Sequence, residues 1–70
     1  MSDLMEVSVN GDARQIPRGA SIAGLLADCD VDPLRVAVEV NEQLVRRAHF
    51  AQTALQPADR IEIVTLVGGG

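Results

Sequence analysis

The sequence of 70 residues has no lysine and only one cysteine. Without lysine, the chain offers no side-chain amine on which a polymer of itself could be built, which argues against that class of protein modifier. Cys29 has no second cysteine to pair with, so it cannot form an internal disulfide, as is typical of a reducing compartment. The N-terminal segment lacks the pattern of a secretory signal, and no apolar run approaches the roughly 20 residues of a membrane span. We therefore expect a cytoplasmic protein that does not enter a membrane.

Common catalytic and cofactor-binding motifs are also missing. The sequence has no glycine-rich phosphate loop with a lysine, no paired cysteines at zinc-binding spacing and no pattern typical of a catalytic triad. Six arginines against ten acidic residues give a net charge of -4, which disfavours partners that are bound through phosphates. We therefore expect no nucleic-acid binding, no intrinsic cofactor and no catalysis by this chain alone.

The length and composition indicate one small folded domain. Hydrophobic residues make up 47% of the sequence and charged residues 23%, which is ordinary for a globular protein. Seventy residues lie near the lower size limit for a single hydrophobic core. We predict a domain over residues 1–67, followed by a flexible glycine tail at residues 68–70.

The first third of the sequence predicts a hairpin and then a helix. Apolar residues alternate over residues 4–9, and Asn10-Gly11, the strongest short hairpin signal, separates them from a second strand at residues 12–16. The second strand alternates weakly, which places it at a sheet edge. Ser21 is positioned to cap a helix. One apolar stripe at helical spacing then follows, formed by Ile22, Leu25, Leu26 and Cys29.

The remaining sequence predicts three more strands. Residues 36–40 alternate as a half-buried strand, and a turn at Asn41-Glu42 leads to a short return strand at 43–45. Residues 46–60 show no clean period and are assigned to a loop with one helical turn. The last strand begins near residue 60. This order predicts an α+β fold of the ubiquitin-like β-grasp type, a small mixed sheet with one packed helix.

Three potential chemical sites are better explained by structural roles. Asp28, Asp30 and Asp32 have the spacing of a calcium loop, but Pro33 stands where that loop requires glycine, so no metal site is predicted. Cys29 lies on the apolar stripe at a helix C-terminus, where a thiol is not activated, and is interpreted as a small buried hydrophobe. The single histidine, His49, has no evident acidic partner and is expected on the surface or in a loop.

The C-terminal end of the sequence is the candidate functional segment. Val64 and Leu66 have the outward parity of the last strand, and with Val67 they would form an apolar docking surface beside the tail. Glycines without Cβ atoms can thread a narrow channel, where the terminal carboxylate reaches the far end. A carboxylate is a poor electrophile and needs activation, for instance as an acyl-adenylate from ATP. Since nothing here binds ATP, a partner would have to supply that step.

Several stretches together resemble the ThiS family of small sulfur carriers in thiamin biosynthesis. The resemblance spans almost the whole chain, and the glycine tail alone would be weakly specific. It is carried by EVSVNG at 6–11, SIAGLL at 21–26, VAVEVN at 36–41, PADRIEIV at 57–64 and the glycines at 68–70.

The resemblance implies a chemistry and a set of partners. An E1-like enzyme would use ATP to adenylate the carboxylate of Gly70, and a sulfur donor such as a cysteine desulfurase would supply the sulfur for a thiocarboxylate. The carrier would then deliver that sulfur to thiazole synthase. Gly69 and Gly70 match the terminal pair of the family, and Gly68 continues the arm. Val64 and Leu66 would lie on the surface with which family members dock their partners.

Other readings of the same sequence remain open. A carrier of this fold also serves as the small subunit of molybdopterin synthase, although that family is usually longer and its tail more often follows proline and larger side chains. Carriers for cysteine synthesis or transfer RNA thiolation share the chemistry and differ in the acceptor. A ubiquitin-like interaction module with an inert glycine tail belongs to a different functional class.

Overall fold

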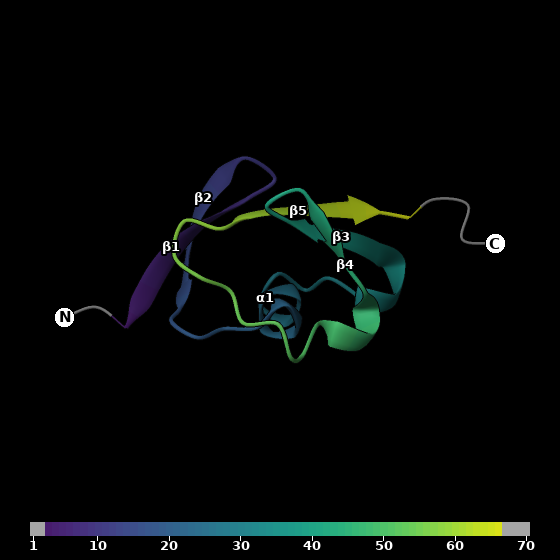
Figure 1. Cartoon of the computed structure of the whole chain (residues 1–70), viewed down its shortest axis with the longest axis horizontal. Helices are drawn as coiled ribbons and strands as arrows, with labels where there is room; N and C mark the ends of the chain where they lie inside the picture. Colours follow the sequence, from purple (N-terminus) through teal and green to yellow (C-terminus); the bar gives the residue numbers. More distant parts are fainter. Residues whose placement is uncertain (1–2, 67–70) are drawn as a thin grey trace.

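The computed structural model describes residues 3–66, which form a five-stranded sheet with one helix and two short 3-10 helices (Figure 1). Within this part of the chain, no helix is long and apolar enough to cross a membrane. The elements, in chain order, are β1 (Leu4–Val9), β2 (Asp12–Pro17), α1 (Ile22–Asp28), η1 (Pro33–Arg35), β3 (Val36–Val40), β4 (Gln43–Val45), η2 (Arg47–His49) and β5 (Arg60–Thr65).

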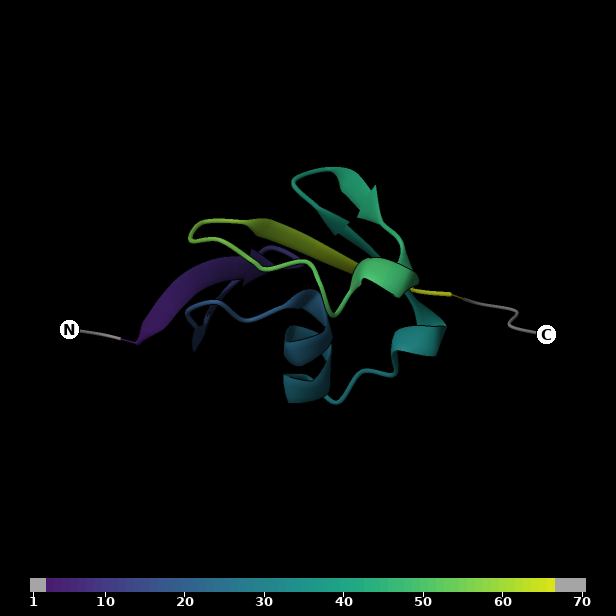
Figure 2. The same cartoon turned by 60° about the horizontal axis from the view of Figure 1, so that its bottom comes forward.

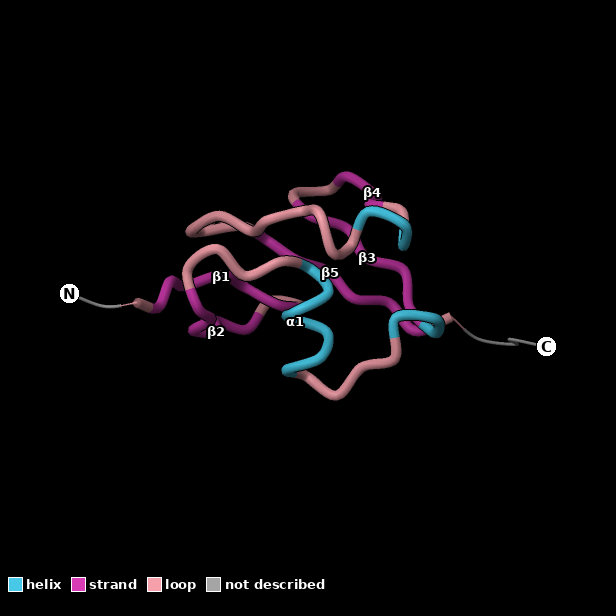
Figure 3. The backbone as a smooth tube through the Cα atoms, turned by 90° about the horizontal axis from the view of Figure 1, so that it is seen from below, coloured by secondary structure: helices cyan, strands magenta, loops and turns pink. Residues whose placement is uncertain are grey.

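The sheet is mixed, and its last strand in sequence is its central strand in space. The spatial order is β2-β1-β5-β3-β4. β1 and β5 run parallel, and the other three neighbouring pairs are antiparallel. Figures 2 and 3 show α1 lying across one face of this sheet. The arrangement is the predicted ubiquitin-like β-grasp, with β2 at an edge as its weak alternation indicated.

The hydrophobic core lies between α1 and the inner face of the sheet. The predicted helix stripe is largely confirmed, because the first three of its four residues are buried, while Cys29 is half-buried and forms the C-cap. Ser21 caps the helix as predicted, and its Oγ accepts a hydrogen bond from the Gly24 N–H at 3.0 Å. The buried core residues are Met5, Val7, Ile16, Ile22, Leu25, Leu26, Val36, Val38, Phe50, Leu55 and Ile61.

The long segment between β4 and β5 belongs to the core more than its sequence suggests. It contains one short helical turn, η2, as predicted, but it also buries Phe50 and Leu55, which are only 3% and 1% exposed. The Leu55 N–H donates to the Ala20 carbonyl at 2.8 Å, and the Ile22 N–H donates to the Thr53 carbonyl at 3.0 Å. These bonds hold the segment against the start of α1. The loop therefore closes one side of the core.

Candidate functional site

The predicted docking residues lie where the central strand β5 ends. Val64 and Leu66 are 54% and 53% exposed, whereas Ile61 on the opposite parity is 1% exposed. Both residues are therefore exposed as predicted, and Thr65 on the opposite parity is exposed as well, because both sides of the sheet are open where β5 ends. Leu66 is still joined to the body, because its N–H donates to the Arg35 carbonyl at 2.8 Å. The body thus fixes the direction of the chain up to Leu66.

A side chain from the first hairpin completes the pairing of β5. Pairing between β1 and β5 covers only two positions, and the Asn10 N–H donates to the Ile61 carbonyl just beyond them. The amide of Asn10 then takes the place of the next strand residues. Its Oδ1 accepts from the Ile63 N–H at 2.7 Å, and its Nδ2 donates to the Ile63 carbonyl at 3.2 Å. The sequence indicated Asn10 only as a turn residue, and no local pattern points to this contact 53 residues away.

Asn41 holds the beginning of β5 in a similar way from the other hairpin. Its Oδ1 accepts from the Arg60 N–H at 3.0 Å, and its own N–H donates to the Arg60 carbonyl at 2.8 Å. Its Nδ2 also donates to Asp59 Oδ1 at 3.0 Å. Both asparagines adopt positive φ angles, 51° for Asn10 and 52° for Asn41, which asparagine tolerates better than most residues. Two turns therefore clamp the strand that leads to the C-terminal end.

The sheet face opposite α1, here called the open face, becomes apolar toward the end of β5. Ala37 on β3 lies directly across from Val64, and the exposed Leu44 on β4 pairs with the next outward residue of β3, Glu39. Leu66 extends the same side beyond the strand. A hollow of about 410 Å³ adjoins this end and is lined by Asp32, Leu34, Arg35 and Leu66. The apolar part of the open face therefore includes Ala37 and Leu44 in addition to Val64 and Leu66, the two described docking residues that the sequence indicated.

The remaining predicted site residues, Val67, Gly68, Gly69 and Gly70, lie outside the described residues. Their roles in docking and in chemistry therefore stay predictions. The structure places the described part of the predicted site, Val64 and Leu66, immediately before them on one exposed face.

Two of the three aspartates at and after the end of α1, Asp28 and Asp32, have structural partners. Asp28 Oδ2 accepts a hydrogen bond from Nη2 of Arg14 at 2.9 Å, and this bond raises the pKa of Arg14. Asp32 caps η1 by accepting from the Leu34 N–H at 2.9 Å, and it lies 3.5 Å from Arg35 Nε. Among residues 3–66, no three histidine, cysteine, aspartate or glutamate side chains gather in a way that could hold a metal ion. His49 is the last residue of η2 and is exposed, so it lies on the surface as predicted.

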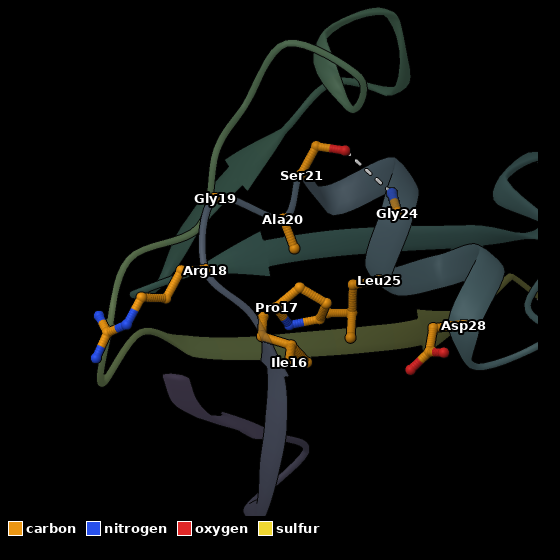
Figure 4. Close-up of a pocket in the computed structure, with 9 residues that line it drawn as sticks. All are labelled: Ile16, Pro17, Arg18, Gly19, Ala20, Ser21, Gly24, Leu25 and Asp28. Atoms are coloured by element: carbon orange, nitrogen blue, oxygen red, sulfur yellow. Dashed lines mark hydrogen bonds between the residues drawn. The ribbon is translucent and has the colours of Figure 1, made fainter. Parts of the chain in front are cut away.

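A second hollow of about 420 Å³ lies between the β2–α1 connection and the helix (Figure 4). Mostly apolar groups line it, and the side chain of Asp28 stands at one end. The Ser21 hydroxyl seen in Figure 4 is already engaged in capping the helix. This hollow is separated from the end of β5 and brings together no set of groups suited to catalysis.

Comparison with known proteins gives a consistent family assignment. The model of the ThiS family matches residues 7–70 of the chain. The sulfur carrier protein ThiS of Escherichia coli (strain K12) is 30% identical over 66 residues, which make up 94% of this chain and 100% of that protein. A crystal structure of the thiamine biosynthesis protein ThiS from Geobacter metallireducens superimposes with a TM-score of 0.83 at 28% identity, covering 94% of this chain and 100% of that one.

A larger protein also contains a similar segment. A thiazole synthase of Paramagnetospirillum magneticum is 36% identical over 66 residues, which represent 94% of this chain. The chain spans only 20% of the length of that relative. The family match covers nearly the whole sequence, and the fold agrees with that of a solved family member. The chain therefore belongs to the ThiS family.

Proposed function

We propose that this chain is a sulfur carrier for thiazole formation in thiamin biosynthesis, with the C-terminal carboxylate of Gly70 as its reactive group. The observation that carries the proposal is the exposed pair Val64 and Leu66 at the end of the central strand, immediately before the glycine tail of a ThiS family member. A rigid sheet would dock on a partner through this pair. The tail would then enter the active site of that partner.

The names of two relatives support the pathway. A full-length relative is a sulfur carrier protein, and a thiazole synthase holds a segment similar to this chain within a longer polypeptide. A carrier and the enzyme that consumes its sulfur act on the same acyl group, so a segment of one inside the other is chemically sensible. This second match favours thiazole synthase as the acceptor over the enzymes of other sulfur-transfer pathways.

The chemistry requires partners at each step. A carboxylate oxygen of Gly70 would attack the α-phosphorus of ATP in an E1-like enzyme, which forms the acyl-adenylate and releases pyrophosphate. A persulfide, for instance on a cysteine desulfurase, would then attack the acyl carbon and displace AMP. Two electrons from a thiol would cleave the resulting S–S bond and leave the thiocarboxylate. The carrier itself would contribute position and an unhindered acyl group, and ATP would bind only to its partner.

Intact-mass measurement tests this proposal directly. The chain is incubated with ATP, an E1-like adenylating enzyme, a cysteine desulfurase, cysteine and a thiol reductant. We expect a mass gain equal to the replacement of one oxygen by sulfur, and fragmentation should place it at Gly70. A control with one alanine added after Gly70 should fold normally and remain unmodified, because the added residue moves the terminal carboxylate away from the reaction site. An unchanged mass for the unextended chain would contradict the proposal and favour an inert interaction module.

A further inference from the structure

We propose that the open face docks a partner surface in which an arginine or lysine is surrounded by apolar side chains, and that Glu39 and Glu62 receive this cation. The inference rests on the proposed function, because the same face leads into the tail. The inference adds to the proposed function the kind of surface that the partner must present. The apolar part of the contact is formed by Ala37, Leu44, Val64 and Leu66.

Two carboxylates face each other in the middle of this surface. Glu39 on β3 is registered directly opposite Glu62 on β5. Side chains in such positions have Cβ atoms roughly 5 Å apart, and like charges there repel each other. The next outward pair along the same strands is Ala37 with Val64, and Leu44 pairs with Glu39 from the other side. The acidic pair therefore stands beside apolar residues on one continuous face.

The described residues provide no cation for this pair. Within residues 3–66, neither Glu39 nor Glu62 forms an ion pair or a side-chain hydrogen bond. The arginine that shares their face, Arg60, has its Nη1 atom 3.9 Å from Glu42 Oε2. Both carboxylates thus remain available, although they lie next to surface that a partner would cover.

A small hollow adjoins Glu62 and can take the end of a long side chain. Its volume is about 180 Å³, and Glu42, Glu62 and Arg60 are among the residues that line it. Glutamate accepts guanidinium hydrogen bonds in a fixed geometry, so Glu62 would orient an arginine that enters beside it, while Glu42 is already paired with Arg60. The residues that line it are Ser8, Gly11, Glu42, Arg60, Ile61 and Glu62.

Charge decides which occupant suits the face. A second copy of the chain would bring two further carboxylates against Glu39 and Glu62, and a phosphate-rich surface would be repelled in the same way. The whole chain carries a net charge of -4, which acts against both. A different protein with a cationic group at the centre of an apolar patch is complementary to both features of the face.

The decisive variant carries Glu39→Gln and Glu62→Gln, which remove the charges and keep the shape. We expect its dissociation constant for the E1-like adenylating enzyme of the same organism, measured by titration calorimetry, to rise about tenfold or more, because a charged bond is lost in a covered contact. A control with Asp12→Asn and Asp30→Asn changes the net charge equally outside the open face. Its dissociation constant should stay within about twofold of the unmodified chain.

Two further readouts separate docking from folding and from chemistry. Because the two glutamates repel each other, the doubly substituted chain should unfold at the same temperature as the unmodified chain or higher. At saturating concentration it should still gain sulfur at Gly70, with a raised KM and an unchanged kcat. If it binds as tightly as the unmodified chain while sulfur transfer proceeds, the inference is wrong and the proposed function stands.

Other outcomes also decide between the inference and its alternatives. Equal weakening by the Asp12→Asn and Asp30→Asn control would show that only the overall charge matters. A dimer in sedimentation experiments that Val64→Asp dissociates would identify a second copy as the occupant. Absence of any binding by the unmodified chain would remove the partner that the inference requires. If binding is specific and lost on Glu39→Gln and Glu62→Gln, but no sulfur is gained by any form, the docking chemistry is upheld and the proposed function fails.

Discussion

At the scale of single residues, two asparagines connect hairpin turns to the central strand. Both polar atoms of the Asn10 side chain form hydrogen bonds with the backbone of Ile63. The side chain of Asn41 forms hydrogen bonds with Arg60 and Asp59. Each residue therefore forms a tight turn with a positive φ and extends the pairing of β5 as well. The sequence alone predicts the first task, because Asn-Gly is a hairpin signal, but not the second, which depends on the folded arrangement.

We expect Asn10→Gly to lower the free energy of unfolding by about 1–3 kcal/mol, since glycine keeps the turn conformation but removes two hydrogen bonds. Urea titration followed by circular dichroism measures this change. Glu42→Gly is the matched control, because it creates the same Asn-Gly turn in the second hairpin. It should stabilise the chain or leave it unchanged, since Glu42 holds a φ of 70° that glycine adopts without strain. Equal loss in both variants would contradict the role of the Asn10 side chain.

At the scale of elements, most predictions from periodicity are confirmed. The five strands, the helix and the Ser21 cap lie where alternation, helical spacing and turn residues place them, within one or two residues. The exposure of Val64 was predictable because a strand exposes every second residue, whereas Leu66 lies just beyond the strand, where Thr65 on the opposite parity is exposed as well. Glu62 is outward for the same reason, but its position opposite Glu39 depends on the register between β3 and β5, which local sequence does not determine.

The segment between β4 and β5 shows where such predictions stop. Phe50 and Leu55 are deeply buried although no period of two or 3.6 residues marks them. Neither residue lies on the face of a long helix or a strand. Their positions are set by backbone hydrogen bonds to other parts of the fold. Phe50 accepts from the Ala23 N–H through its carbonyl at 3.1 Å, and Leu55 donates to Ala20. The burial of irregular segments is therefore a tertiary property.

We expect Phe50→Ala to reduce the free energy of unfolding by about 3–5 kcal/mol, because it removes a large side chain from the core and leaves a cavity. This is a large fraction of the roughly 5–15 kcal/mol typical of whole domains, so the variant should unfold at a clearly lower denaturant concentration than the unmodified chain. The neighbouring His49→Ala changes an exposed side chain and should have an effect within about 0.5 kcal/mol. Denaturant titration of both variants gives the comparison. Similar values would contradict the core role of Phe50.

At the scale of the whole molecule, the glycine tail is predicted to contribute nothing to the free energy of unfolding of the folded domain. All the described core residues lie between Met5 and Ile61, and the last described hydrogen bond to the body involves Leu66. Deletion of residues 68–70 should therefore leave the free energy of unfolding within about 0.5 kcal/mol of the full chain. The same deletion should abolish sulfur loading. A substantial loss of stability would show that the glycines belong to the folding unit and would contradict the predicted boundary.

The central position of β5 has a mechanical consequence. A partner that grips the C-terminal end pulls along a strand held on one side by β1 and Asn10, and on the other by β3. Such a force acts in shear, along the strand. The hydrogen bonds between β5 and both neighbouring strands therefore resist it together, and they do not break one after another. The folded domain should therefore resist force applied at its C-terminal end, and repeated insertion and withdrawal of the terminus should leave the sheet intact.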